Sequence, residues 1–242
     1  MQVSQFHYLP LTTEFFGALI GLLVLVLIFL GLLRIFGMLR KAYENLGVSS
    51  RTAMLLLLGS LVGSYFNIPI AELPDEPMTH HHAIGYFGMQ YAVPPGDWKG
   101  TVIAINVGGA VIPMAMSLYL LAKRELWVKG LIATAVVAII IHWWATPVPG
   151  LGIAVPVFMP AIITAIVALV LSRQEAAPLA YIGGGLGTLI GADLTNLDKV
   201  PGLGAPVASI GGAGTFDGIF LTGILAVLLA SLLARPNAAQ PR

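Results

Sequence analysis

The run FFGALIGLLVLVLIFLGLL at residues 15–33 contains nineteen residues and no charged side chain. About 20 predominantly apolar residues in a helix are enough to cross the hydrocarbon core of a bilayer. Glu14 precedes the run, whereas a secretory signal peptide starts with basic residues and has a shorter apolar region. The run therefore predicts a transmembrane helix that is retained in the chain.

The composition of the whole chain points to the same class of protein. Of the 242 residues, 57% are hydrophobic and 10% are charged, against about a quarter charged in soluble domains. The net charge of +1 argues against a nucleic-acid partner, which would need a clustered basic face. The absence of cysteine excludes disulfides, thiolate catalysis and iron–sulfur ligation by this chain. We expect a single membrane domain over residues 1–242.

Further apolar segments of spanning length follow the first one. They are predicted at 52–71, 100–122, 130–145, from about 153 onward, 177–193 and 209–233. The stretch Pro147-Val148-Pro149-Gly150 separates the fourth from the fifth, because proline cannot continue a helix and glycine favours a turn. The predicted fold is an all-α polytopic membrane protein with about seven transmembrane helices.

The orientation of these helices follows from the Lys and Arg residues in the loops. Cytoplasmic loops carry an excess of both residues. One side of the predicted path holds ten of them: Arg34, Arg40, Lys41, Arg51, Lys123, Arg124, Lys129, Arg173, Arg235 and Arg242. The other side holds only Lys99 and Lys199. We therefore predict an outer N-terminus and a cytoplasmic C-terminus.

Two pairs of glycine motifs predict an internal repeat. LGSLVG at residues 58–63 is similar to LGTLIG at 186–191, and NVGGA at 106–110 is similar to SIGGA at 209–213. The pairs occur in the same order, which suggests parallel repeat units at 10–125 and 153–235 around a connecting helix at 130–146. Parallel repeats are one known plan of transporters. The alternative is that Gly-x-x-x-Gly recurs only because small residues let membrane helices pack closely.

Ionisable residues at membrane depth are costly and mark candidate sites. Asp217 lies about eight residues into the predicted seventh helix, and Asp193 ends the sixth, so both fall towards the outer face. Thr215, Asn67 and Asn106 lie at similar depth, and we predict that they line the same site. The structural alternative is that the carboxylates cap helix ends and that the Asn residues bridge helices.

The predicted outer loop, residues 72–99, contains His80, His81 and His82 beside several acidic residues. Two of these His with one carboxylate could bind a metal ion, although three adjacent His cannot all face one metal from a regular element. A solvated polar loop is the alternative interpretation. No other cofactor is evident from the sequence.

Three segments resemble one known family. They are GADLTNLDKVPGLGAPVASIGGAGTFDGIFLTG at residues 191–223, NIP at 67–69 and NVGGAVIP at 106–113. All three are similar to the prokaryotic domain-of-unknown-function family 1614. The resemblance implies a multi-pass protein of the cytoplasmic (inner) membrane of bacteria or archaea, and it implies no particular activity.

Three functions are compatible with these features. We favour transport of a small solute or ion at a site containing Asp217 and Asp193, which would make the chain a non-enzyme in the lipid bilayer. The alternative is an intramembrane aspartyl hydrolase in which the same two Asp share a proton. The Gly-x-Gly-Asp motif of such enzymes is absent from both positions. A third hypothesis is a metal-related or assembly subunit of the membrane. The substrate and the oligomeric state stay open.

Overall fold

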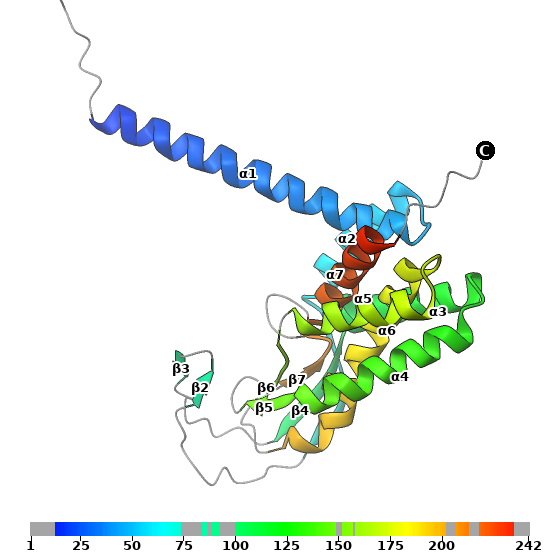
Figure 1. Cartoon of the computed structure of the whole chain (residues 1–242). Helices are drawn as coiled ribbons and strands as arrows, with labels where there is room; N and C mark the ends of the chain where they lie inside the picture. Colours follow the sequence, from blue (N-terminus) through cyan, green and yellow to red (C-terminus); the bar gives the residue numbers. More distant parts are fainter. Residues whose placement is uncertain are drawn as a thin grey trace, which may run out of the picture.

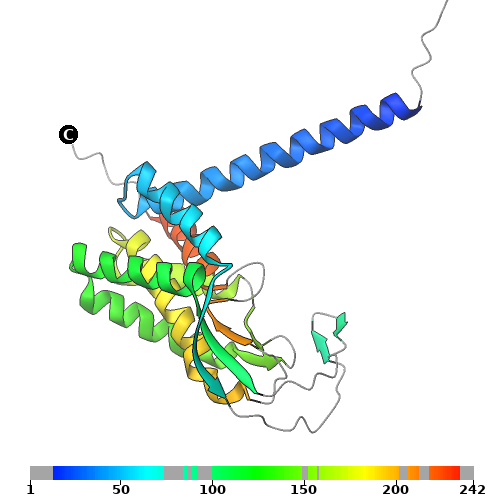
Figure 2. The same cartoon turned by 180° about the vertical axis from the view of Figure 1, so that it is seen from behind.

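The structure is a computed structural model that describes most of the chain as seven α-helices, seven short strands and three turns of other helix types. The described residues are 13–73, 84–86, 89–91, 100–148, 152–156, 158–201, 207–212 and 218–234. In Figures 1 and 2, a long helix α1 projects from a body in which the other helices pack together and strands lie at one end. The chain is therefore largely helical, as the sequence predicted.

Helix α1 (Thr13–Asn45) has two parts with different surroundings. Its apolar residues from Ile20 to Leu33 are exposed, whereas Ala42 and Tyr43 near its end are buried against the body. Length and composition qualify two described helices as candidate membrane spans, Ile20–Asn45 and α4 (Trp127–Trp144). The other apolar helices of the described part are shorter. A helical chain with apolar helices is confirmed, while the seven-span topology and the repeat stay predictions.

The predicted helix at 52–71 is wrong in its second half. Helix α2 (Ser50–Gly63) ends early, and strand β1 (Asn67–Leu73) follows it. Pro69 lacks the amide hydrogen that a helix needs and pushes Ile68 towards an extended backbone. Proline is tolerated in a strand at the edge of a sheet, which is the position of β1. The apolar run therefore changes from helix to strand near Asn67.

The predicted helix at 100–122 is also divided. Strand β4 (Thr101–Asn106) comes first, then a π-helical turn η1 (Val107–Val111) and helix α3 (Ile112–Lys123). The β-branched residues of β4 favour an extended backbone. The Asn106 side chain accepts a hydrogen bond from the Gly109 amide and so caps the start of the helical segment.

The last predicted spans show the same change of structure towards the strand end of the body. Helix α6 (Ala176–Thr188) continues as a π-helical turn η2 (Leu189–Asp193) and a 3-10 helix η3 (Leu194–Lys199). The predicted seventh helix begins as strand β7 (Val207–Ile210), and helix α7 (Gly218–Leu233) starts only later. A helix over the whole of 209–233 is therefore wrong.

The predicted break at Pro147–Gly150 corresponds to a change of element in the structure. After α4, short strands β5 (Thr146–Val148) and β6 (Gly152–Ala154) pair with each other, and helix α5 (Met159–Leu171) follows. A second pair, β2 (Ile84–Tyr86) and β3 (Met89–Tyr91), lies within the predicted outer loop.

A three-stranded sheet of order β1-β4-β7 joins the divided segments. β1 pairs with β4 in antiparallel fashion, so that Asn67 lies opposite Asn106, and the register shifts between Pro69 and Ala71. β4 pairs with β7 in parallel, which places Ile105 opposite Ile210. The sheet thereby brings together three chain segments that are far apart in the sequence.

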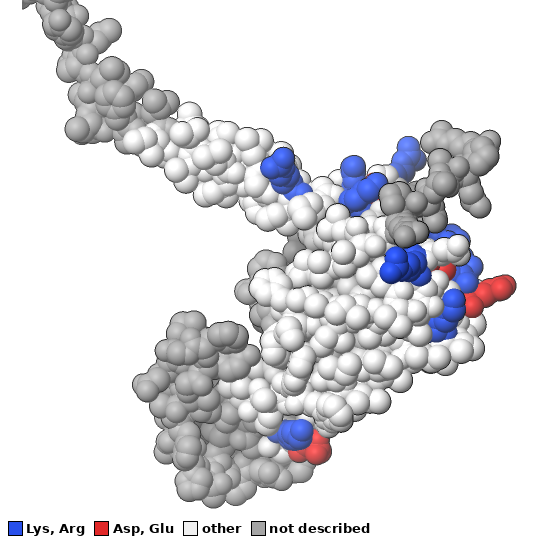
Figure 3. Space-filling view, viewed as in Figure 1, with Lys and Arg blue, Asp and Glu red and all other residues white. Residues whose placement is uncertain are grey.

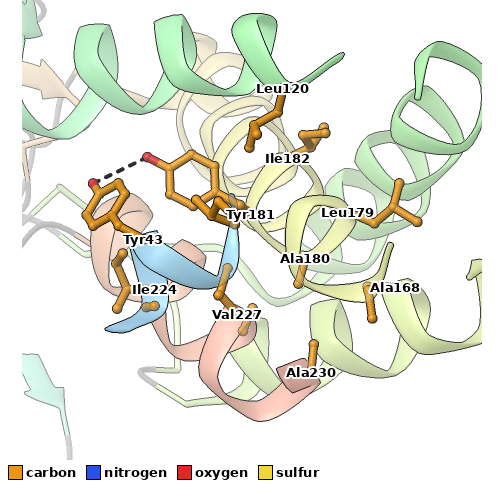
Figure 4. Close-up of a cluster of buried hydrophobic side chains, with 14 of the residues drawn as sticks. Tyr43, Leu120, Ala168, Leu179, Ala180, Tyr181, Ile182, Ile224, Val227 and Ala230 are labelled. Atoms are coloured by element: carbon orange, nitrogen blue, oxygen red, sulfur yellow. Dashed lines mark hydrogen bonds between the residues drawn. The ribbon is translucent and has the colours of Figure 1, made fainter. Parts of the chain in front are cut away.

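Helix α6 is the central element of the helical core, which we define as α6 with α3, α4, α5 and α7 around it (Figure 4). Leu179, Ile182 and Tyr181 of α6 are almost wholly buried, and the Tyr181 hydroxyl lies 3.5 Å from that of Tyr43. A Cβ on Gly184 would lie 3.2 Å from the Gly223 Cα of α7, so the two helices approach closely. Small residues permit this distance.

The two Gly-x-x-x-Gly motifs have different neighbours in this arrangement. A Cβ on Gly63 would lie 2.9 Å from the amide nitrogen of Gly108, whereas a Cβ on Gly187 would lie 2.7 Å from Val137 Cβ of α4. Close packing explains Gly63, Gly187 and Gly191, whereas a Cβ on Gly59 would make only an ordinary contact with Ile112 Cδ1 at 3.5 Å. Their similarity in sequence therefore has a local reason at each place.

Candidate functional site

Polar side chains meet where the strands of the β1-β4-β7 sheet end. Asn106 is 2% exposed, and its Nδ2 donates hydrogen bonds to the Ser64 carbonyl oxygen at 2.7 Å and to Asn67 Oδ1 at 3.1 Å. Its Oδ1 accepts from the Gly109 amide at 2.8 Å. Asn106 therefore connects the end of α2, the start of β1 and the start of η1.

Strand β7 adds a third segment to this group. Ser209 Oγ donates to Asn67 Oδ1 at 2.5 Å, so the Asn67 oxygen accepts from both Asn106 and Ser209. The parallel pairing of β7 with β4 brings Ser209 into reach of Asn67. Two of the predicted site residues, Asn67 and Asn106, are thus in direct contact.

Asp193 joins the same region through Gly211. The Gly211 amide donates to Asp193 Oδ2 at 2.8 Å, and Asp193 is the last residue of the π-helical turn η2. Gly211 has φ +76°, and a Cβ there would lie 2.6 Å from Ala110 Cβ. Both the left-handed backbone and the close approach require glycine at this position. We call Asn67, Asn106, Asp193 and Ser209 the strand-end cluster.

The charge of Asp193 has no ionic partner within the described part of the chain. The ion pairs found there join Arg40 and Lys41 to Glu44, and Arg124 to Glu175, at the other end of the body. Asp193 is half-buried, and its hydrogen bond to the Gly211 amide engages only one of its two carboxylate oxygens. A carboxylate in this state could take up a cation, a proton or a hydrogen-bond donor of a solute.

Asn196 has a supporting role beside Asp193. It is fully buried, and its Nδ2 donates to the carbonyl oxygens of Gly191 and Ala192 at 3.0 Å each. These carbonyls belong to the irregular end of the sixth helix, where the regular α-helical pattern is lost. Asn196 therefore satisfies backbone groups that the change of helix type leaves open.

The other predicted site residues are placed as follows. Asp217, Thr215, His80, His81 and His82 lie outside the described residues. Among the described residues, no group of three or more His, Asp or Glu could hold a metal ion.

Sequence reasoning missed Ser209, Gly211 and Asn196 as members or supports of the site. A signal for Ser209 was present, because SIGGA at 209–213 aligns Ser209 with Asn106 of NVGGA. Gly211 acts through its backbone amide, and the Asn196 side chain binds backbone carbonyls; the sequence shows no signal for such contacts.

The fold and this cluster define a largely helical protein with apolar helices and a polar junction at the strand ends. The chain belongs to the family described as "Protein of unknown function (DUF1614)", whose model matches residues 61–229. The match covers more than half of the chain and includes all members of the strand-end cluster. The comparisons with curated proteins and with solved structures give no match.

Proposed function

We propose that this chain is an integral membrane protein that moves a small solute or ion across the bilayer and binds it at the strand-end cluster. The family contributes no activity to this proposal. The support comes from the surface of the helices, the distribution of charge and the chemistry around Asp193.

The exposed surface of the helices supports a place in the bilayer. Leu25 of α1 is 65% exposed, Leu55 of α2 71% and Val170 of α5 80%. Monomeric soluble proteins rarely expose contiguous apolar patches larger than a few hundred Å². Lipid would cover such residues without cost, because lipid tails are as apolar as leucine.

The charges support the same location. In Figure 3, Lys and Arg gather at the end of the body where α1 joins it, and a small charged group lies near the opposite end. The surface between them in this view is largely free of Lys, Arg, Asp and Glu. A body with an uncharged middle and charged ends suits a bilayer.

The single observation that carries the transport proposal is the position of Asp193. It lies where a helix loses its regular form, without an ionic partner in the described residues, and beside two segments that change between strand and helix. Interrupted helices that expose polar backbone are a known way to build binding sites in transporters. An ionisable residue in such a place suggests function by default.

The chemistry of the cluster favours a small cation or a solute with a hydrogen-bond donor. Asp193 supplies one negative charge, and the oxygens of Asn67 and Ser209 lie in the neighbouring segments. These are oxygen groups of the kind that bind hard cations and polar hydrogens. One carboxylate among neutral groups favours a single positive charge.

Reconstitution of the full chain into liposomes tests the proposal. Proton flux is followed with an internal pH dye, and sodium flux with radioactive sodium. Asp193→Asn keeps an oxygen that can accept from Gly211 but removes the charge, so we expect flux to fall to the rate of protein-free liposomes. Asp198→Asn is the matched control, because Asp198 is exposed on η3 only five residues away.

Three outcomes would contradict the proposal. Equal flux in Asp193→Asn and the unchanged chain would remove Asp193 from the site. Absence of flux together with cleavage of a membrane-spanning peptide, lost in both Asp193→Asn and Asp217→Asn, would establish the aspartyl hydrolase instead. Tight metal binding by the untagged chain that depends on His80–His82, without flux, would favour the metal-related subunit.

A further inference from the structure

A cavity of about 540 Å³ lies at the end of the body opposite the strand-end cluster. It is bounded by the turn between α1 and α2, by α2 and by α3. Its lining includes Ser49, Thr52, Leu56, Met116, Tyr119 and Lys123. None of these residues belongs to the proposed transport site.

The lining is polar at one end and apolar at the other. On α2, Ser49 and Thr52 come before Leu56, and on α3, Ile112 and Met116 come before Tyr119 and Lys123. The polar residues of both helices lie towards the α1–α2 turn and the end of α3. The cavity therefore has a hydroxyl- and ammonium-bearing end and an apolar end.

Lys123 is exposed and keeps hydrogen-bonding capacity for a ligand. Its Nζ donates to the Tyr119 hydroxyl at 2.6 Å and lies 5.1 Å from the centre of the Tyr119 ring. An ammonium group has three donors, so further contacts are available. The Ser49 and Thr52 hydroxyls lie 2.9 Å from each other beside the same cavity.

The surroundings of the polar end carry excess positive charge. Arg40, Lys41 and Arg51 come from α1 and α2, and Arg124 and Lys129 follow Lys123 in the sequence. The acidic groups of this end are Glu44, Glu125 and Glu175, of which Glu44 and Glu175 are in ion pairs. An anion at the cavity would therefore meet a net positive field.

The outer surface beside the cavity is apolar. Leu55 of α2 is 71% exposed and Leu118 of α3 is 50% exposed. Ala115 lines the cavity and is itself exposed, so the apolar end of the cavity opens to this surface. A ligand with an anionic head and an apolar tail fits these two ends.

We propose that this cavity binds one anionic phospholipid. Its phosphate contacts Lys123 and the hydroxyls of Ser49 and Thr52, and an acyl chain lies along Leu56, Ile112 and Met116. The inference rests on the proposed place in the bilayer and is independent of transport at Asp193. Charge complementarity and the amphiphilic lining decide in favour of lipid over a peptide or a second copy of the chain.

Native mass spectrometry of the delipidated full chain tests this proposal. Dioleoylphosphatidylglycerol and dioleoylphosphatidylcholine are the probes, and we expect the first to bind more tightly. Lys123→Gln should weaken phosphatidylglycerol binding about fivefold, the usual effect of one basic residue near an anionic lipid surface. Lys129→Gln is the matched control, because Lys129 is exposed at the same end but does not line the cavity.

A second pair of variants tests the apolar end. Ala115→Trp should block the apolar end of the cavity and abolish lipid binding, whereas Leu118→Trp on the same helix should leave binding unchanged. Neither position is in the buried core, and thermal unfolding in detergent verifies that both variants fold.

The proposal is overturned by equal loss in Lys123→Gln and Lys129→Gln, which would mean diffuse charge attraction. It is overturned equally by unchanged binding in Ala115→Trp. If inorganic phosphate or glycerol phosphate displaced the bound lipid as well as a second lipid does, the site would recognise the free anion and not a phospholipid. Flux that persists without lipid binding, or the reverse, separates this proposal from the proposed transport function.

Discussion

In the helical core, α6 meets its neighbours through small apolar residues, while at the strand-end cluster separate segments meet through hydrogen-bonded side chains. Gly187 touches α4 with no room for a Cβ in an undisturbed structure, and Gly184 packs tightly against α7. Asn106 instead forms three hydrogen bonds to three other residues. Asn106 is buried like the helical core, whereas Asn67 is exposed and Asp193 and Ser209 are half-buried, and different forces hold the two regions.

The hydroxyl groups of the two regions also differ in their hydrogen bonding. Ser117, Thr134 and Thr164 are buried on α3, α4 and α5, and their side-chain oxygens have no hydrogen-bond partner within the described structure. At the strand-end cluster, Ser209 donates to Asn67 at 2.5 Å. The helical core therefore depends on volume, and the strand-end cluster depends on polar pairing. Added atoms should therefore destabilise the helical core, and the loss of polar atoms should destabilise the strand-end cluster.

The largest effect is expected from added volume in the core. In Gly187→Ala the new Cβ would lie 2.7 Å from Val137 Cβ and 3.2 Å from the Thr134 carbonyl oxygen. We expect a loss of about 3 kcal/mol in the free energy of unfolding, because α4 must move. Denaturant titration in detergent micelles measures it.

Gly223→Ala is the control for this variant. Its Cβ would meet Tyr181 ring carbons at 3.7 and 3.8 Å, which is ordinary contact. In a helix interior, alanine is also more favourable than glycine by about 0.5–1 kcal/mol in the free energy of unfolding. Equal destabilisation of both variants would show that the core does not depend on close approach at α4.

A slightly smaller effect is expected from a polar loss at the strand ends. Asn106→Ala leaves the Ser64 carbonyl and the Gly109 amide without their side-chain partner. The buried unpaired groups should cost about 2 kcal/mol in the free energy of unfolding. Hydrogen exchange at residues 64–70 and 107–110 should rise more than in α6, which locates the damage. A uniform increase in hydrogen exchange throughout the chain would contradict a local role of Asn106.

The smallest effect comes from comparing one serine in each region. Ser209→Ala removes a short hydrogen bond and should cost about 1 kcal/mol. Ser117→Ala removes a buried hydroxyl without a partner and should change the free energy of unfolding by less than about 0.5 kcal/mol. Thermal unfolding of the two variants in the same detergent compares them. If Ser117→Ala destabilised the protein more than Ser209→Ala, the distinction between the two regions would be wrong.

The strand-end cluster was predicted in part. Asn67, Asn106 and Asp193 were identified because polar residues at membrane depth are uncommon and costly. Their contacts depend on the pairing of β1 with β4 and of β4 with β7, over sequence separations that no local pattern encodes. Ser209 and Gly211 are recognised as part of the site only from that pairing.

Four properties follow from the sequence alone: the apolar helices, the segregation of charge, the break near Pro147 and the family. These properties depend on composition and on neighbouring residues. The strands at residues 67–73, 101–106 and 207–210 depend on tertiary contacts and could not be predicted, because hydropathy is the same for an apolar helix and an apolar strand. A strand needs a partner for its backbone hydrogen bonds, and the chain supplies that partner from far away in the sequence.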